Sequence, residues 1–252
     1  MRQFRRTRPR RGPGGYLFGI FTGTVVNAAL VIAGTLIGCI FKTEKLKRIG
    51  DRVFQAFACF VLVLGVSGAS QLLRPVFTLI SLVIGISVGE LCDIDDKFNR
   101  LGNSLQRRFA KGAEGGSFAE AFVSAPLLFC IGSMTIMGAL QGGLEDQHSI
   151  YYTKGLIDAV SAAGFAMGSG VGVAFAALSV LVYQGLLTAG ASLLSGILTD
   201  EIVALSTQIG SLSLIAIAFN MLGITKIKVA NFLPAMFVPI VWQAVLTVFG
   251  AA

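Results

Sequence analysis

The stretch YYTKGLIDAVSAAGFAMGSGVGVAFAALSVLVYQGLLTAGASLLSGIL, residues 151–198, decides the fold class of this chain. It is almost wholly apolar and long enough to cross a lipid bilayer twice, because one helical crossing needs about 20 residues. Lys154, Asp158 and Gln184 lie within it. Charged and amide side chains are costly in hydrocarbon, so these three residues are the strongest functional signal in the sequence. The stretch predicts a multi-pass membrane protein.

The composition of the whole chain agrees with a membrane protein. Hydrophobic residues make up 54% of 252 positions, charged residues 13%, and the mean hydropathy is +0.78. A soluble domain has about 25% charged residues. The net charge of +7 comes from basic residues in short flanks between apolar runs, where a membrane topology signal is expected. We therefore expect lipid as the partner of these residues and no nucleic acid.

The apolar runs predict an all-α fold, a polytopic transmembrane bundle with about eight crossings. The expected crossings are residues 17–41, 53–73, 76–92, 117–141, 151–175, 177–198, 201–222 and 231–249. Seven is the fallback, because the central pair has a poorly marked turn for which Gly168–Gly172 is a rival position. Pro126 should kink the fourth crossing or free a carbonyl. Residues 16–252 form one transmembrane domain, and the Arg-rich residues 1–15 form a disordered tail.

Residues 93–116 are the longest polar stretch, and they predict a helix that lies in the membrane interface. Ile94, Phe98, Leu101, Leu105 and Phe109 share one helical face, and basic residues decorate the rest. That pattern is typical of an amphipathic helix on anionic lipid. The alternative is a plain solvated connector.

The distribution of basic residues predicts the orientation. Twelve Lys and Arg residues lie in the connections after the first, third and seventh crossings, at Lys42, Lys45, Lys47, Arg48, Arg52, Lys97, Arg100, Arg107, Arg108, Lys111, Lys226 and Lys228. The opposite connections hold only Arg74 and Lys154. This bias places those three connections in the cytoplasm and both termini outside. The six arginines of the tail argue the other way.

A weak internal repeat links two of the crossings. The phrase that begins at Asn27 resembles the phrase that begins at Gln184, since both place an amide first and small residues at matching positions. The two helices enter the membrane from opposite sides, so a true repeat would be inverted, as in many secondary transporters. Chance recurrence of small residues and leucine is the alternative.

Asp158 is the sharpest candidate for a substrate or ion site. It lies roughly 10 Å inside its helix, and Lys154 lies four residues earlier on the same face. The pair is either a structural ion pair or a carboxylate that faces a polar cavity. The other candidates are amides and one further carboxylate in or beside apolar runs: Gln184, Asn231, Asn27, Asn220 and Glu90. Asn231 precedes Pro234 and Pro239, which should break the last helix and expose carbonyls of the kind that line transporter sites.

Enzyme signatures are missing from the sequence. There is no nucleophile elbow, zinc-protease helix, phosphate-binding loop or dinucleotide fingerprint. The four cysteines match no metal motif, and a single histidine, His148, cannot form a metal site alone. We expect no catalytic residue, no metal and no cofactor.

Several phrases resemble the YdfK/YqgA-like family, bacterial inner-membrane proteins that carry a domain of unknown function, DUF554. They are Gly23-Thr-Val-Val-Asn27, Gly89-Glu90, Ser149-Ile-Tyr-Tyr-Thr-Lys154-Gly-Leu-Ile-Asp158, Tyr183-Gln184-Gly185 and Lys228-Val-Ala-Asn231-Phe-Leu-Pro234-Ala. The resemblance covers roughly residues 19–245. It implies the fold class and the bacterial inner membrane, and it adds no substrate. Members usually begin close to the first phrase, so the arginine tail departs from the pattern.

Two functional hypotheses follow. The first is a transporter or channel for a small solute or ion, coupled to a proton or cation at Asp158, with Gln184 and the broken helix near Asn231. The second is a non-transporting membrane protein that acts through helix–helix assembly, in a homo-oligomer or with a partner, through Gly-x-x-x-Gly faces. A cavity that reaches Asp158 would favour transport, and a dry, fully packed bundle would favour assembly.

Overall fold

The structure is a computed structural model that describes residues 19–41, 46–70, 73–109 and 117–249. Every regular element in these ranges is helical, and no strand occurs among them. The elements are α2 (Thr22–Ile40), α3 (Lys47–Ala69), α4 (Pro75–Leu91), α5 (Ile94–Phe109), α6 (Ser117–Cys130), α7 (Ser133–Glu145), α8 (Ser149–Ser169), η1 (Gly170–Phe175), α9 (Ala176–Ala189), α10 (Ala191–Leu194), α11 (Asp200–Met221), η2 (Val229–Phe232) and α12 (Leu233–Val248). The predicted tail, residues 1–15, and the end of the predicted interfacial segment, residues 110–116, lie outside the described ranges.

The helices expose apolar side chains and bury polar ones, which is the reverse of a soluble protein. Val63, Val83 and Val160 are 63%, 59% and 75% exposed, whereas Thr35 and Gln184 are fully buried. A lipid-facing exterior explains this distribution, since hydrocarbon solvates valine well and leaves polar groups to find partners inside. The all-α membrane bundle expected from the sequence is confirmed.

Five helical segments are long and apolar enough to cross a membrane, or up to seven if each of two bent pairs is one span. The five are Thr22–Ile40, Lys47–Ala69, Ser149–Ala189, Asp200–Met221 and Val229–Val248. The bent pairs are Pro75–Leu91 with Ile94–Arg108 and Phe118–Cys130 with Ser133–Glu145. The segment Ser149–Ala189 turns back on itself. If its two arms are counted as separate crossings, the range of five to seven crossings rises by one.

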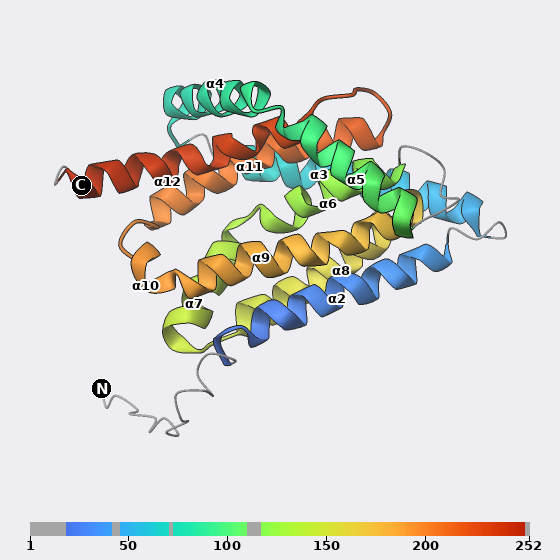
Figure 1. The fold of residues 1–252 in the computed structure, drawn as a ribbon, viewed down its shortest axis with the longest axis horizontal. Coiled ribbons are helices and arrows are strands. Elements are labelled where there is room, and N and C mark those ends of the chain that lie inside the picture. Colours follow the sequence, from blue (N-terminus) through green and yellow to red (C-terminus); the bar gives the residue numbers. More distant parts are fainter. Residues whose placement is uncertain (1–18, 42–45, 71–72, 110–116, 250–252) are drawn as a thin grey trace.

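The turn within Ser149–Ala189 is at η1, the rival turn position in the sequence. Gly170 at the end of α8 has φ = 76°, a conformation that glycine adopts without a steric cost. Tyr151 near the start of α8 contacts Thr188 near the end of α9, so the two arms run in opposite directions. Both arms lie beside α2, which runs parallel to α8 and antiparallel to α9 (Figure 1).

The fourth predicted crossing is broken into α6 and α7. The two helices meet at an angle of 62°. The break is at Gly132, whose φ = 127° and ψ = 148° are closed to residues with a Cβ atom. Pro126, where the sequence predicted a kink, lies inside α6, five residues before Ile131, the first residue after that helix. The 62° bend therefore lies at Gly132, and a kink at Pro126 itself stays a prediction.

Glycines allow the closest helix contacts. A Cβ atom on Gly34 or Gly38 of α2 would overlap the backbone carbonyls of Ala159 or Ala163 on α8, and one on Gly85 of α4 would overlap the backbone of α12. These pairs pack helices of the same chain. An oligomer through glycine faces stays a prediction.

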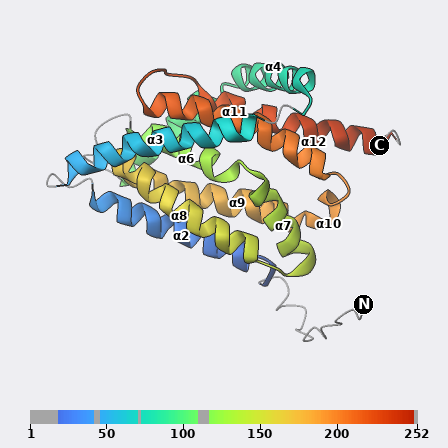
Figure 2. The same ribbon diagram turned by 180° about the vertical axis from the view of Figure 1, so that it is seen from behind.

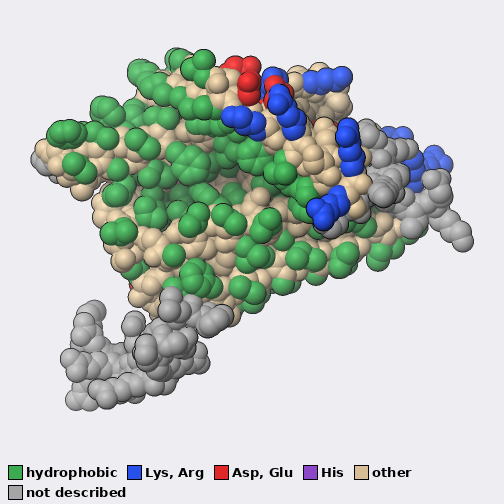
Figure 3. All heavy atoms as spheres, viewed as in Figure 1, with side chains coloured by type: hydrophobic (Ala, Val, Ile, Leu, Met, Phe, Trp, Pro, Cys, Tyr) green, Lys and Arg blue, Asp and Glu red, His purple; other side chains and the backbone are tan. Residues whose placement is uncertain are grey.

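The described Lys and Arg side chains gather at one end of the visible face, around α5 and the adjoining connections (Figure 3). At this end α5 leaves α4 at 52°. Ile94 and Phe98 of α5 pack on the core, and Lys97 and Arg100 are exposed. The predicted amphipathic helix is therefore present over the described residues. Its contact with anionic lipid stays a prediction. At the other end, α2 begins and α12 ends (Figure 2).

Candidate functional site

A buried ion pair on α8 is the centre of the candidate site. Lys154 and Asp158 are each 5% exposed, and Lys154 Nζ lies 2.5 Å from Asp158 Oδ2. The four-residue spacing places both side chains on one helical face. Lys154 Nζ also donates to the carbonyl oxygen of Phe129, at 2.7 Å. The sequence predicted the ion pair but not its third member.

The Phe129 carbonyl is available to Lys154 because α6 ends one residue later, at Cys130. The last carbonyls of a helix have no partner in the next turn, and together they carry a partial negative charge. The ammonium group of Lys154 donates a hydrogen bond to one of these carbonyls and also balances their partial negative charge. The break between α6 and α7 thus explains how a lysine is held inside the bundle.

Two of the amides predicted from the sequence join this ion pair. Asn27 of α2 interacts with Asp158, and its Nδ2 donates to Gln184 Oε1 of α9 at 3.3 Å. Both amides are fully buried. Asn27 Oδ1 and Gln184 Nε2 have no hydrogen-bond partner among the described residues. The structure therefore brings together Lys154, Asp158, Asn27 and Gln184 from three helices. It also places the two halves of the predicted repeat in contact, while the repeat itself stays a prediction.

A cavity of about 290 Å³ adjoins the pair at the α6–α7 break. Its walls come from α3, the break itself, α8 and α11. Besides Lys154 and Asp158, its polar lining residues are Ser133, Ser161, Thr207 and Ser211. Asp158 therefore borders open space that is only partly enclosed by the helices, since the lining residues Leu64 and Ile157 are themselves exposed.

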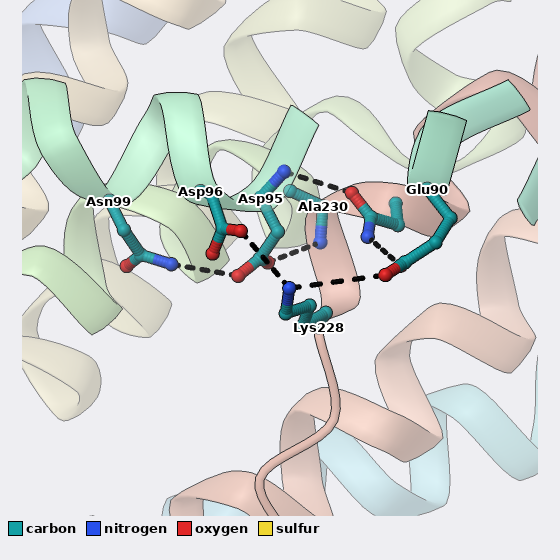
Figure 4. A network of polar contacts seen from close by, with 7 residues as sticks. Glu90, Asp95, Asp96, Asn99, Lys228 and Ala230 are labelled. Atoms are coloured by element: carbon teal, nitrogen blue, oxygen red, sulfur yellow. Dashed lines mark hydrogen bonds and ion pairs between the residues drawn. The ribbon is translucent and has the colours of Figure 1, made fainter. Parts of the chain in front are cut away.

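Glu90 and Asn231 lie in a second cluster, at the basic end of the molecule, where α4, α5 and η2 meet. Figure 4 shows Glu90 there with Asp95, Asp96 and Lys228. Asn231 Nδ2 donates to Glu90 Oε2 at 2.5 Å, and Asn231 Oδ1 accepts the backbone N–H of Asp95 at 2.9 Å. Asp95 Oδ1 in turn accepts the N–H of Ala230 at 3.1 Å. Asn231 thus accepts a free backbone N–H in the first turn of α5, and Asp95 accepts one in the first turn of η2. The arrangement ties the α4–α5 bend to the start of α12.

Lys228 completes this second cluster. Its Nζ lies 3.1 Å from Asp96 Oδ2 and 3.9 Å from Glu90 Oε1. The hydrogen bond to Asp96 raises the pKa of Lys228 above its usual range. Burial raises the pKa of Asp95, and the bonds from Ala230 and Asn99 oppose that rise in part. The contacts of this cluster are explained by its structural role, which is to hold the α4–α5 bend against the start of α12.

Asn220 belongs to neither cluster. Its side chain accepts from Ile227 N and Thr225 Oγ1 and donates to Ile227 O, so it closes the turn after α11. The last helix is interrupted at only one of the two prolines expected to break it. The 3-10 helix η2 precedes α12, which begins beside Pro234, but α12 continues as one helix through Pro239, so the predicted break there is wrong. This helix break lies with Glu90 at the basic end. The sequence hypothesis had placed the break and Asp158 in one site, but the two are not side by side.

The sequence analysis missed the helix break and the hydroxyl groups of α11. Gly132 followed by Ser133 was a usable signal, since a glycine before a small polar residue often starts a helix. Thr207 and Ser211 carry no signal, because such residues are common in membrane helices. Among the described residues, no group of three His, Cys, Asp or Glu side chains is placed to hold a metal ion.

Comparisons with known proteins agree with the resemblance seen in the sequence. The family described as "Protein of unknown function (DUF554)" matches residues 22–244. The chain is 31% identical over 232 residues to "Uncharacterized membrane protein YdfK" of Bacillus subtilis, covering 90% of this chain and 98% of that protein. It is 25% identical over 232 residues to "Uncharacterized protein YqgA" of Escherichia coli, covering 91% and 99%. No solved structure gives a significant match.

Proposed function

Since the chain belongs to the family described as protein of unknown function (DUF554), we propose its function from its own interior site: it transports a small solute or ion across the membrane. The observation that carries the proposal is the cavity at the α6–α7 break, which is bordered by a buried ion pair. Charged residues inside a membrane bundle are costly, and they commonly mark a substrate or ion pathway.

The broken helix supports the same proposal. In many secondary transporters a discontinuous helix near the middle of the membrane presents its free backbone groups to the substrate. The break at Gly132 lies between helices of 14 and 13 residues, so it is near the middle of the span. The residues at the break, 131–134, line the same cavity as Asp158.

Asp158 is the residue that we propose for coupling to a proton or another cation. Its carboxylate is held by Lys154 and Asn27, which belong to different helices. A proton or cation on Asp158 would weaken the ion pair and change the contact between α2 and α8. Such a change in the packing of two helices is one way to link ion binding to alternating access.

We also propose the location and orientation: a bacterial inner membrane, with the basic end at the cytoplasm and both termini outside. The alternative, a non-transporting protein that acts through assembly, has less support. The glycine pairs on α2 and α4 are occupied by helices of the same chain. No enzymatic activity is proposed.

The test is flux in liposomes that contain the purified protein. Salts of different ions are added outside, and a trapped dye reports the internal pH while a second dye reports the membrane potential. We expect one or more salts to produce a signal above that of empty liposomes, and Asp158→Asn to abolish it.

Asp200→Asn is the matched control, because Asp200 is an exposed carboxylate in the first turn of α11. It should leave the flux unchanged. Equal flux through wild type and Asp158→Asn would refute the role of Asp158. Absence of flux with every salt and small solute would refute transport.

A further inference from the structure

The cavity at the α6–α7 break is rich in hydrogen-bond donors. A lysine ammonium has three N–H groups. Lys154 uses two of them, on Phe129 O and Asp158 Oδ2, and no acceptor among the described residues takes the third. Lys154 is 5% exposed and lines the cavity. A buried cation therefore has an unused donor beside open space.

The start of α7 supplies more donors to the same cavity. Gly132 precedes the helix, and no side chain caps it. Among the described residues no acceptor takes the N–H groups of Gly132, Ser133 and Met134, and all three residues line the cavity. The N-terminus of a helix of this length, 13 residues, carries a partial positive charge. Backbone N–H groups in that position are a common binding site for anions.

Two hydroxyl groups in the cavity wall also lack partners in the part of the chain that the structure describes. Ser161 is 6% exposed, shares a helical face with Lys154 and Asp158, and makes no hydrogen bond within the described residues. Thr207 Oγ1 on α11 is buried without a partner. An unsatisfied buried hydroxyl costs about 1–3 kcal/mol. A ligand that accepts hydrogen bonds would satisfy both hydroxyls.

One lysine engages two of the acceptors at the break, the carbonyl oxygen of Phe129 and the carboxylate of Asp158. Lys154 covers the C-terminal end of α6 and neutralises Asp158. The positive end of α7 has no corresponding counter-charge among the described residues. The cavity therefore offers several free donors: one N–H of Lys154, the first N–H groups of α7 and the two hydroxyls.

We propose that this cavity binds a small anion, held by the first N–H groups of α7, the free donor of Lys154 and the hydroxyls of Ser161 and Thr207. The proposal deepens the proposed function, because it names the class of substrate for the same site. The cavity of about 290 Å³ suits inorganic anions and short carboxylates. Both classes share the chemistry that the donors recognise.

Binding is measured on the full-length protein in detergent, by its melting temperature at constant pH and ionic strength. Sodium chloride, nitrate, formate and acetate form the anion arm, with a bulky sulfonate as the balancing anion. Lithium, sodium and potassium salts of that sulfonate form the cation arm. We expect a saturable rise in melting temperature with at least one small anion and none in the cation arm. A difference between halide or nitrate and carboxylate separates the two classes.

Ser133→Pro locates the site. Proline is favoured in the first turn of a helix, so it removes the Ser133 N–H without breaking α7. Ser133→Ala removes the hydroxyl and keeps that N–H. We expect Ser133→Pro to bind the anion about tenfold or more weakly than Ser133→Ala, since a hydrogen bond to a charged group contributes that much. Ser161→Ala is a second variant. It should weaken anion binding several-fold without lowering the melting temperature in the absence of anion, because it removes a hydroxyl that has no partner.

Three results would overturn the proposal. The first is stabilisation by cations alone, which would assign the cavity to a cation on Asp158. The second is anion binding that is equal in Ser133→Ala and Ser133→Pro and unaffected by Ser161→Ala. The third is no anion binding at all in a wild type that transports other solutes in liposomes. Anion binding without any flux would leave this inference standing and refute the proposed transport instead.

Discussion

At the scale of single residues, Lys154 and Asp158 depend on each other. Both are 5% exposed, so removal of either leaves a buried charge without its partner. We expect Lys154→Met and Asp158→Leu each to destabilise the protein by about 3–5 kcal/mol. The double substitution should recover much of that loss, because an apolar pair avoids the cost of burying charges. Unfolding of the purified variants in detergent, analysed as a double-mutant cycle, measures the coupling.

The exposed pair Arg74–Glu201 is the control for this cycle. Its atoms approach to 2.6 Å, yet the side chains are 58% and 49% exposed. Solvent screens such a pair, and we expect a coupling of about 1 kcal/mol or less. If the double variant at Lys154 and Asp158 is no more stable than the single variants, the cost of burial is not what links these residues.

Asp95 predicts a dependence of stability on pH. Burial raises its pKa in the folded protein, so the folded state holds this proton more tightly than the unfolded state does. The contribution of Asp95 is therefore most favourable below the ordinary pKa, about 4, and decreases as the pH rises through the raised folded value. Asp95→Asn stays neutral, and its carbonyl can still accept the Ala230 N–H. We expect the variant to gain stability relative to wild type as the pH rises from about 4.

Melting temperatures of wild type and Asp95→Asn over a pH series test this expectation. Asp96, Lys228 and Glu90 lie nearby, but they are present in both proteins, so their contributions to the comparison largely cancel. Asp51→Asn, at an exposed carboxyl of α3, should show no such trend. A wild type that gains on the variant as the pH rises would contradict the assignment.

At the scale of helices, the fold depends on the contact between α2 and α8. Gly34 lies against the backbone of Ala159, so Gly34→Ala would force the two helices apart. Within the described part of the chain, no heavy atom lies near the position of a Cβ on Gly185 of α9. We expect Gly34→Ala to destabilise the protein by more than 2 kcal/mol, as overpacking does. Gly185→Ala should be neutral or stabilising, by up to about 1 kcal/mol, because alanine favours helix.

Thermal unfolding and the yield of folded protein compare these two glycine variants. Both substitutions add one methyl group inside a membrane helix, so the difference between them isolates the contact with α8. If both variants lose stability equally, the added methyl acts through the helix itself and not through the contact with α8.

The helix ends show where sequence reasoning fails at this scale. The second crossing was predicted to start at residue 53, but α3 starts at Lys47, because basic residues continue the helix beyond the apolar run. The fourth was predicted as one helix, but Gly132 divides it. Hydrophobicity marks what lies in the bilayer, and it does not mark where backbone hydrogen bonds begin or stop.

At the scale of the whole molecule, α2 begins and α12 ends at the end opposite the basic connections (Figure 1). Because positive residues favour the cytoplasm, we expect a fusion after Ala252 to lie outside. Alkaline phosphatase fused there should be active, and fluorescent protein should not. A tag inserted at Gly223, between α11 and η2, should give the opposite result. Fluorescence from the C-terminal fusion would show that the arginine tail sets the orientation.

The sequence by itself determined the class of protein, most of the helical segments and the ion pair, because each follows from local properties: apolar runs of sufficient length, and charges four residues apart on one helix. It also indicated Asn27 and Gln184, since buried amides stand out in apolar runs. Only the tertiary structure decided which of these residues meet. Asn27 reaches Asp158 and Gln184 because α2 lies against both arms of the α8–α9 hairpin, whereas Asn231 meets Glu90 at the other end of the bundle. The cavity and its donors depend on five helices at once, and contacts between residues so far apart in the chain leave no periodic pattern in the sequence.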